Sequence, residues 1–161
     1  MHSGVITADI VNSTFLDNRT EKQFTSSIKR ILSPFQFEFY RGDSLQIFVK
    51  NAEQCLQIVM LLRALAKKTE IKNYRFDFKT SIGIGDVKKP VKDIRTAKGQ
   101  AFLLSGRGYD TNIILKQRNF TILCGKEPFD TAFEILAYYF DYIFRRLTPK
   151  QAAIVYELAT G

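Results

Sequence analysis

The sequence has few of the residue types on which many enzymes rely. Its 161 residues include one histidine, two cysteines and no tryptophan. A single histidine, His2, excludes histidine-based catalytic triads and zinc sites with several histidine ligands. Cys55 and Cys124 lie far apart in apolar segments without CxxC spacing, which is typical of buried thiols. Any chemistry must therefore use carboxylates, lysine or arginine, hydroxyls or a hard metal ion.

Long apolar runs are also missing. No stretch approaches the roughly 18 apolar residues of a membrane-spanning helix, and the start MHSGVITADI lacks the basic region and apolar run of a secretory signal. We therefore expect a cytoplasmic protein with no membrane contact. The 24 lysines and arginines against 16 aspartates and glutamates give a net charge of +8, and 45% apolar residues are ordinary for a globular domain.

Hydrophobic periodicity predicts an α+β fold, with an antiparallel sheet and helices on one face. The predicted strands are 4–11, 35–40, 45–49, 75–84, 111–116 and 119–124, and the predicted helices are 22–32, 52–68, 99–107, 129–147 and 149–160. The composition of the sequence changes near residue 126. Residues 1–125 carry 20 basic and 11 acidic side chains, whereas 126–161 carry 4 and 5. We interpret 1–125 as the main domain and 126–161 as a helical extension.

Two aspartates form the most informative pattern. Asp9 ends the first strand, and Asp43 occupies the Gly-Asp turn between the strands 35–40 and 45–49. Both carboxylates can converge on Mg²⁺ or Mn²⁺, which prefer oxygen ligands and retain water or phosphate. Two such ions can bridge the attacking and leaving oxygens of a phosphoryl transfer. In the alternative interpretation, Asp9 caps the following turn and Asp43 is an ordinary turn residue.

Four motifs, in order, resemble those of the class III nucleotidyl cyclase fold and, more closely, of the bacterial SatD-like family. They are ADIVNS in the first strand, YRGDSLQIF in the hairpin, SIGIG in the next strand and GQAFLLSGR after it. The resemblance covers about residues 4–110. It implies a ferredoxin-like palm in which Asp9 and Asp43 match the two metal-binding aspartates and the Ile10 carbonyl is a further ligand of Mg²⁺ or Mn²⁺.

In active cyclases of this family, the metal ions position a nucleoside triphosphate so that its 3′-hydroxyl attacks the α-phosphate. The resemblance places Arg107 at the family's transition-state arginine. Leu103 occupies the asparagine position four residues earlier. An apolar side chain cannot orient the ribose or phosphate, so the departure argues for nucleotide binding with little turnover. Active cyclases also assemble their site across a homodimer interface, so the resemblance implies that this chain forms a homodimer.

Basic residues near these motifs are candidates for phosphate binding. Arg41 precedes the Gly-Asp turn and can offer a bidentate guanidinium. The loop 87–98 can form a phosphate-attracting rim through Lys88, Lys89, Arg95 and Lys98, with Lys92 beside them. The alternative is that all of these side chains are merely solvated.

The last residues, LTPKQAAIVYELATG, resemble the opening helix of a helix-turn-helix regulator. We interpret them as the start of a DNA-binding region that continues beyond Gly161, or as a helix that packs on the main domain or a partner. The leading hypothesis is a sensor that binds a metal-nucleotide and signals to that region. The alternatives are an active nucleotidyl cyclase or nucleotidyltransferase and a protein-interaction domain with a degenerate site.

Overall fold

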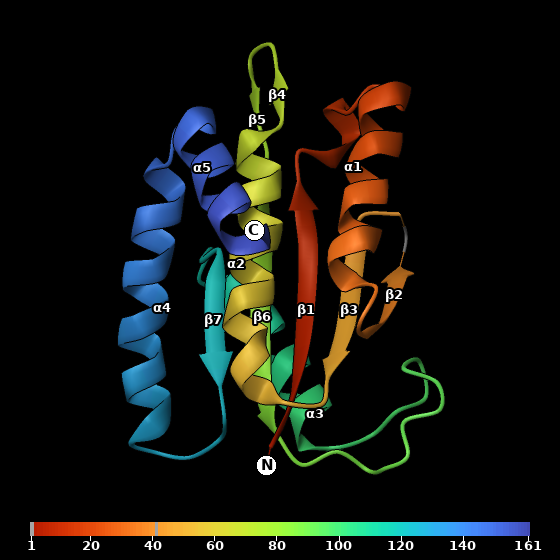
Figure 1. The fold of residues 1–161 in the computed structure, drawn as a ribbon. Coiled ribbons are helices and arrows are strands. Elements are labelled where there is room, and N and C mark those ends of the chain that lie inside the picture. Colours follow the sequence, from red (N-terminus) through yellow and green to blue (C-terminus); the bar gives the residue numbers. More distant parts are fainter. Residues whose placement is uncertain (1, 41) are drawn as a thin grey trace.

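The computed structural model describes residues 2–40 and 42–161. Its main element is a five-stranded sheet in the order β2-β3-β1-β6-β7 (Figure 1). The strands are β1 (Ser3–Val11), β2 (Gln36–Tyr40), β3 (Ser44–Val49), β6 (Asp77–Gly85) and β7 (Phe120–Leu123). Neighbouring strands are antiparallel except β6 and β7, which are parallel. A small separate sheet pairs β4 (Glu70–Ile71) with β5 (Tyr74–Arg75).

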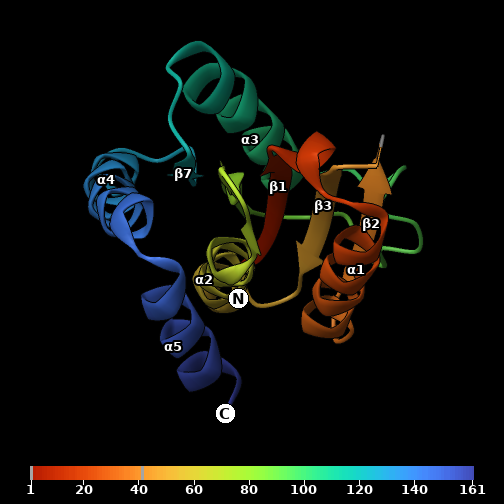
Figure 2. The same ribbon diagram turned by 90° about the horizontal axis from the view of Figure 1, so that it is seen from above.

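Helices cover both faces of the main sheet (Figure 2). One face carries α1 (Asn18–Leu32) and α2 (Cys55–Lys68), and the other carries α3 (Gln100–Gly108). The order β1-α1-β2-β3-α2-β6 is that of a ferredoxin-like palm, which confirms the predicted α+β class. The layer formed by α3 was not indicated by the periodicity. No helix in the described part of the chain combines the length and apolarity that crossing a bilayer requires.

Alternation along β1 decides what each face of the sheet contains. Ile6, Ala8 and Ile10 join the main core with α1 and α2. Val5 packs with Ala101 of α3 in a second, smaller cluster on the other face. Asp9 lies four positions after Val5, an even interval, so its side chain is on the same face of the sheet as α3. The core side of the sheet is therefore apolar, and the α3 side becomes polar towards the end of β1.

The predicted hairpin of 111–116 and 119–124 is wrong. Residues Tyr109–Leu115 continue α3 as a π-helical segment, η3, and only Phe120–Leu123 forms a strand, which pairs with β6 rather than with 111–116. Thr111 donates its hydroxyl to the Arg107 carbonyl, and the Asn112 amide donates to the Thr121 hydroxyl. These contacts and the burial of Ile113 outweigh the β-propensity of the TNIIL run, which is a weak preference.

The remaining helices are α4 (Phe129–Arg146) and α5 (Pro149–Thr160). Figures 1 and 2 place α4 beside β7 and α5 beside α2. Ala137 and Phe144 of α4 and Tyr156 of α5 belong to the same core as the palm strands. A capping box between Thr148 and Gln151, followed by Pro149 in the first turn, starts α5.

A buried ionic cluster joins α2, β6 and α4. The Arg63 side chain is fully buried and donates two hydrogen bonds of 2.8 Å to Asp77 and one of 2.8 Å to Asp141. Lys67 Nζ also lies 3.2 Å from Asp77 Oδ2. The Arg63 guanidinium carbon lies 5.2 Å from the ring centre of Phe144, an arrangement typical of a cation–π contact. Because a buried charge is costly without partners, the cluster requires all three elements in place.

We predict that Arg63→Ala lowers the free energy of unfolding by about 3–5 kcal/mol, because the substitution leaves Asp77 and Asp141 buried beside each other without their main cation. Urea unfolding at neutral pH measures the loss. Arg145→Ala is the matched control, since Arg145 approaches the same Asp141 at only 3.9 Å and is 55% exposed. Its expected cost is below about 1 kcal/mol. Equal losses in the two variants would contradict the assignment.

Candidate functional site

The structure brings Asp9 and Asp43 to the same edge of the sheet. In the antiparallel pairing of β1 and β3, Asp9 lies opposite Ser44, which directly follows Asp43. The backbone N–H of Ile10 donates to the Asp43 carbonyl over 3.2 Å. Asp43 lies more than 30 residues after Asp9 and Ile10 in the chain. Strand pairing makes the three residues neighbours.

Two serines orient the carboxylates. Ser44 Oγ donates to Asp9 Oδ1 over 2.6 Å, and Ser13 Oγ donates to Asp43 Oδ2 over 3.0 Å. Ser13 belongs to a short 3-10 turn, Ser13–Phe15, that follows β1. Within residues 2–40 and 42–161, no hydrogen bond reaches the second oxygen of either carboxylate. Each aspartate therefore has one oxygen held by a serine and one available for a ligand.

The aspartates lie on the part of the sheet face that α3 does not cover. Near its start, α3 packs closely on Gly83, and Ser105 lies at hydrogen-bond distance from Thr7 (2.7 Å) and donates to the Ser81 carbonyl. Asp9 lies two residues beyond Thr7, opposite Lys79 of β6. The result is a polar surface bounded on one side by the end of α3.

Partial burial sets the charge balance of Asp9. Loss of hydration raises the pKa of its carboxyl, the Ser44 hydrogen bond lowers it, the nearby charge of Asp43 raises it and Lys79 lowers it, with a raised pKa as the net result. Repulsion between the carboxylates is the situation that a divalent cation relieves. The short separation that makes the two carboxylates repel each other therefore also favours a cation bound between them.

Tyr109, the first residue of η3, belongs to the same surface. Burial raises the pKa of its phenol, and the negative charges of Asp9, Asp43 and Asp110 raise it further. The phenol therefore stays protonated and can act as a hydrogen-bond donor. π-Helical segments of this kind are frequent at functional sites.

The donor set fits a hexacoordinate ion with exogenous ligands. No group of three or more histidine, cysteine or acidic side chains able to hold a metal occurs in the described part of the chain. Mg²⁺ is commonly held by one or two carboxylates together with water and substrate phosphates. Asp9 and Asp43 supply that number, so any cation here would depend on a phosphorylated ligand for its remaining positions.

Arg107 is on the outer side of α3. The buried side chains of α3 are Ala101, Ser105 and Gly108, whereas Leu103 and Arg107 are exposed. Since residues four apart share a helix face, Leu103 and Arg107 project together, away from the sheet. The structure of one chain does not bring Arg107 to the aspartates. Arg41 lies outside the described residues.

The start of the basic loop, with Lys88 and Lys89, does not form a rim around the aspartates. Gly85, which precedes the loop, pairs with Ser3, at the opposite end of β1 from Asp9. Ser3 and Asp9 are six positions apart along the strand, or about 20 Å. Lys88 pairs its backbone with Lys98 at that far end, and Lys89 follows it. Arg95 pairs with Asp93 at 2.9 Å. It also lies near Glu38 and Tyr40 of β2, and Tyr40 pairs with Ser44 next to Asp43.

Sequence reasoning missed Lys79, Tyr109 and the two orienting serines. The alternation along β6 already assigns Lys79 to the face opposite Phe78, which was a usable signal. Tyr109 was missed because the segment after Arg107 was interpreted as a loop and strand. Ser13 reaches Asp43 only through tertiary structure.

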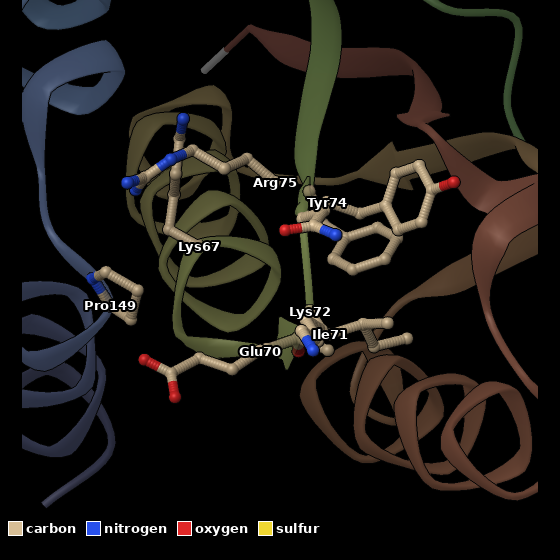
Figure 3. A pocket seen from close by; sticks show the side chains of 10 residues that line it. Lys67, Glu70, Ile71, Lys72, Tyr74, Arg75 and Pro149 are labelled. Atoms are coloured by element: carbon tan, nitrogen blue, oxygen red, sulfur yellow. The ribbon is translucent and has the colours of Figure 1, made fainter.

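A hollow lies beside the β4–β5 hairpin, apart from the aspartates. It has a volume of about 540 Å³, and Figure 3 shows Lys67, Glu70, Lys72, Tyr74 and Arg75 around it, with Pro149 of α5 on one side. Lys67 is already paired with Asp77, and Glu70 places a negative charge among the remaining cations. The mixture of charges favours no single ligand class, so the aspartate edge remains the better candidate.

We predict that Asp9→Asn raises the melting temperature by a few degrees at pH 7, because it removes a partly buried charge next to Asp43 while keeping an acceptor for Ser44. A raised pKa in the folded state means that the protonated form is favoured. The gain is therefore largest above that pKa and vanishes as pH falls towards the ordinary value of 3.8. Thermal unfolding from pH 3.5 to 7.5 tests this.

Asp17→Asn serves as the control, because we expect it to change the melting temperature in the opposite direction. Asp17 caps α1, and hydrogen bonds from Thr20 and Arg19 lower the pKa of its carboxyl. The substitution should lower the melting temperature above pH 4. A destabilising effect of Asp9→Asn at pH 7 would contradict the assigned repulsion.

Comparison with known proteins identifies the fold. No protein family model matches the chain, and no curated protein matches it by sequence. Solved structures, in contrast, do resemble its fold. The monomeric guanylyl cyclase domain of the RhoGC fusion protein from the aquatic fungus Blastocladiella emersonii has a TM-score of 0.53 and 14% identity over 68% of this chain and 75% of that one.

The catalytic core of a rhodopsin-guanylyl cyclase with converted specificity, in complex with ATPalphaS, has a TM-score of 0.53 and 13% identity, covering 68% of this chain and 72% of that one. An adenylate/guanylate cyclase/hydrolase from Silicibacter pomeroyi has a TM-score of 0.50 and 16% identity, covering 69% and 70%. At such identities the likeness concerns the fold alone. The chain has a nucleotidyl-cyclase-like palm fold.

Proposed function

We propose that the chain binds a nucleoside triphosphate with Mg²⁺ or Mn²⁺ at the edge formed by Asp9 and Asp43. The observation that carries the proposal is the meeting of these two carboxylates on the uncovered face of a cyclase-like palm. Support also comes from the serine contacts, which leave one oxygen of each carboxylate available. One of the similar cyclase cores is itself in complex with ATPalphaS.

Each residue at this edge has a defined task in the proposal. Asp9 and Asp43, with the Ile10 carbonyl, would hold the cation, which neutralises phosphate charge and fixes its geometry. Lys79, opposite Asp9, supplies a cation beside the carboxylates. Tyr109 remains a neutral donor towards a phosphate or sugar oxygen, because its phenol resists ionisation.

The proposed role is sensing with little turnover. Leu103 stands where the cyclase resemblance expects an asparagine, and its exposed side chain offers no hydrogen bond to a ribose or phosphate. The SatD-like relationship and the reading of α5 as the start of a DNA-binding region beyond Gly161 remain predictions. In a sensor of this kind, nucleotide binding would be passed on through α4 and α5.

An active nucleotidyl cyclase or nucleotidyltransferase is the second candidate. Arg107 favours it, because its side chain is exposed at the end of α3 and faces away from its own sheet. Such an arginine can reach phosphate only if a homodimer brings it to the aspartates of the other copy. The absence of a polar residue at position 103 weighs against high activity.

We predict that Asp43→Asn reduces Mn²⁺-dependent binding of ATP or GTP at least about tenfold, because the substitution removes one of two anionic cation ligands. Isothermal titration calorimetry with and without Mn²⁺ measures the effect. Asp86→Asn is the matched control, since Asp86 is a strongly exposed aspartate at the far end of β1 and should not alter binding.

The same samples distinguish the candidates. Binding without cyclic or pyrophosphate product supports the sensor, whereas product formation that requires Asp43 and Arg107 supports the cyclase. Wild-type protein that binds neither triphosphate in Mn²⁺, or an Asp43→Asn variant that binds as tightly as wild type, would refute the site.

A further inference from the structure

We propose that the outward face of α4 is an antiparallel helix–helix interface between two copies of this chain. The proposal is independent of the nucleotide site. It rests on the apolar character of α4, on the spacing of its exposed residues and on the distribution of charge along it.

The helix α4 is apolar well beyond the side that it buries. Its inner side contributes Phe133, Ala137, Phe140 and Phe144 to the core. Large apolar side chains outside that buried side are 44% to 66% exposed: Phe129, Ile135, Leu136, Tyr138, Tyr139, Tyr142 and Ile143. Leu136 lies at the boundary, where it lines an apolar hollow with Phe133 and with Ile82, Ile84 and Ile122 of the sheet. A helix that is apolar all round is normally buried all round, whereas only one side of α4 is covered in a single chain. Figures 1 and 2 show the other side at the margin of the molecule.

Charge is almost absent from this outer side. From Ile135 to Phe144 the only ionisable residue with a charge at neutral pH is Asp141, and Asp141 points inwards to Arg63. Apolar patches of this extent on a soluble domain mark interaction sites. The partner surface must therefore be apolar as well.

The exposed residues follow a heptad pattern. Phe129, Ala132, Leu136, Tyr139 and Ile143 are spaced three, four, three and four residues apart, and all five are exposed. This is the a/d spacing with which one helix packs along another. The pattern specifies a helical partner that runs nearly parallel to the axis of α4.

Charge at the ends of α4 selects a second copy in antiparallel orientation. Asp130 lies in the first turn and Arg145 and Arg146 in the last. Antiparallel pairing brings each acidic end next to a basic end, whereas parallel pairing would bring like charges together. Lys116, Arg118, Arg145 and Arg146 line a hollow beside Tyr138 and Tyr142, but Arg118 pairs with Glu134 and Arg145 lies near Asp141. Residues 126–161 carry 4 basic and 5 acidic side chains, so α4 and α5 carry no excess positive charge of the kind that favours nucleic acid or an anionic membrane.

The register follows from the layers of an antiparallel coiled coil, in which a positions face d positions. Leu136 faces Tyr139 of the other copy, and the small Ala132 faces Ile143. At the ends, Phe129 faces Arg146. Next to the central pair of Leu136 and Tyr139, the large Ile143 thus meets the small Ala132. An 18-residue helix spans about 27 Å, so the interface is small, and we expect a dissociation constant in the micromolar range.

The first experiment measures the oligomeric state by analytical ultracentrifugation between about 1 and 200 μM, a range chosen to bracket micromolar affinity. Wild type should shift from monomer to dimer, and Tyr139→Glu should remain monomeric, because it places a charge in the central layer. Leu103→Glu is the matched control. Leu103 is also apolar and 52% exposed, but it lies on α3 beside Arg107 and should leave the dimer intact. Unchanged melting temperatures confirm that both variants fold.

The second experiment tests orientation by oxidation to disulfides in a Cys124→Ser background, since Cys55 is buried. The double variant Ala132→Cys/Ile143→Cys should form a covalent dimer, because residues 132 and 143 face each other in the antiparallel layers. Ala132→Cys alone should not, because its two copies would lie about 16 Å apart along the axis. Nucleotide and Mn²⁺ are omitted, so a failure here leaves the proposed function untouched.

Four results would overturn the proposal. The first is wild-type protein that stays monomeric up to about 200 μM, the range set by the expected affinity. The second is cross-linking of the single variant Ala132→Cys, which indicates parallel helices. The third is loss of the dimer in Leu103→Glu but not in Tyr139→Glu, which assigns the dimer to α3. The fourth is binding of monomeric protein to neutral phosphatidylcholine vesicles through Tyr139, which assigns the face to lipid.

Discussion

The guanidinium of Arg63 is completely buried, and carboxylates from two distant parts of the chain balance its charge. Asp77 is the first residue of β6, and Asp141 belongs to α4. Because an unpaired charge in the interior is strongly unfavourable, α2 cannot keep its position unless both β6 and α4 are docked. The palm and the helices after residue 126 are therefore linked by an electrostatic requirement as well as by their shared apolar core.

The candidate site depends on the sheet that this cluster supports. Pairing of β1 with β3 places Asp9 beside Asp43, and pairing of β1 with β6 places Lys79 on the other flank. A slip of one residue in either pair would turn Asp9 or its partners to the apolar face. Tight packing of α3 on Gly83 and Ser81 leaves the end of the sheet uncovered, so the acidic edge remains open to ligand.

Much of the fold could be inferred from hydrophobic spacing. The strands 4–11, 35–40 and 45–49 and the long helices correspond closely to the elements observed, because each has one strongly apolar side. The pair of aspartates was also identifiable, since Asp9 lies near the end of the first strand and Asp43 lies in the turn of the hairpin. The hairpin at 111–124 was wrong because β-branched residues are compatible with a helix once Asn112 and Ile113 find tertiary partners. The loop with Lys88 and Lys98 could not be placed relative to Asp9, because composition carries no information about which end of a strand a loop approaches.

The sequence by itself determined the residue types available for chemistry and the amphipathic pattern of the elements. A single histidine, two isolated cysteines and two turn-associated aspartates restrict the chemistry to oxygen ligands and cations. Only the tertiary structure decided that Ser13, Ser44, Lys79 and Tyr109 surround those aspartates and that Arg107 faces away. The physical reason is that strand register and helix docking depend on the packing of residues distant in the chain, which local spacing does not encode.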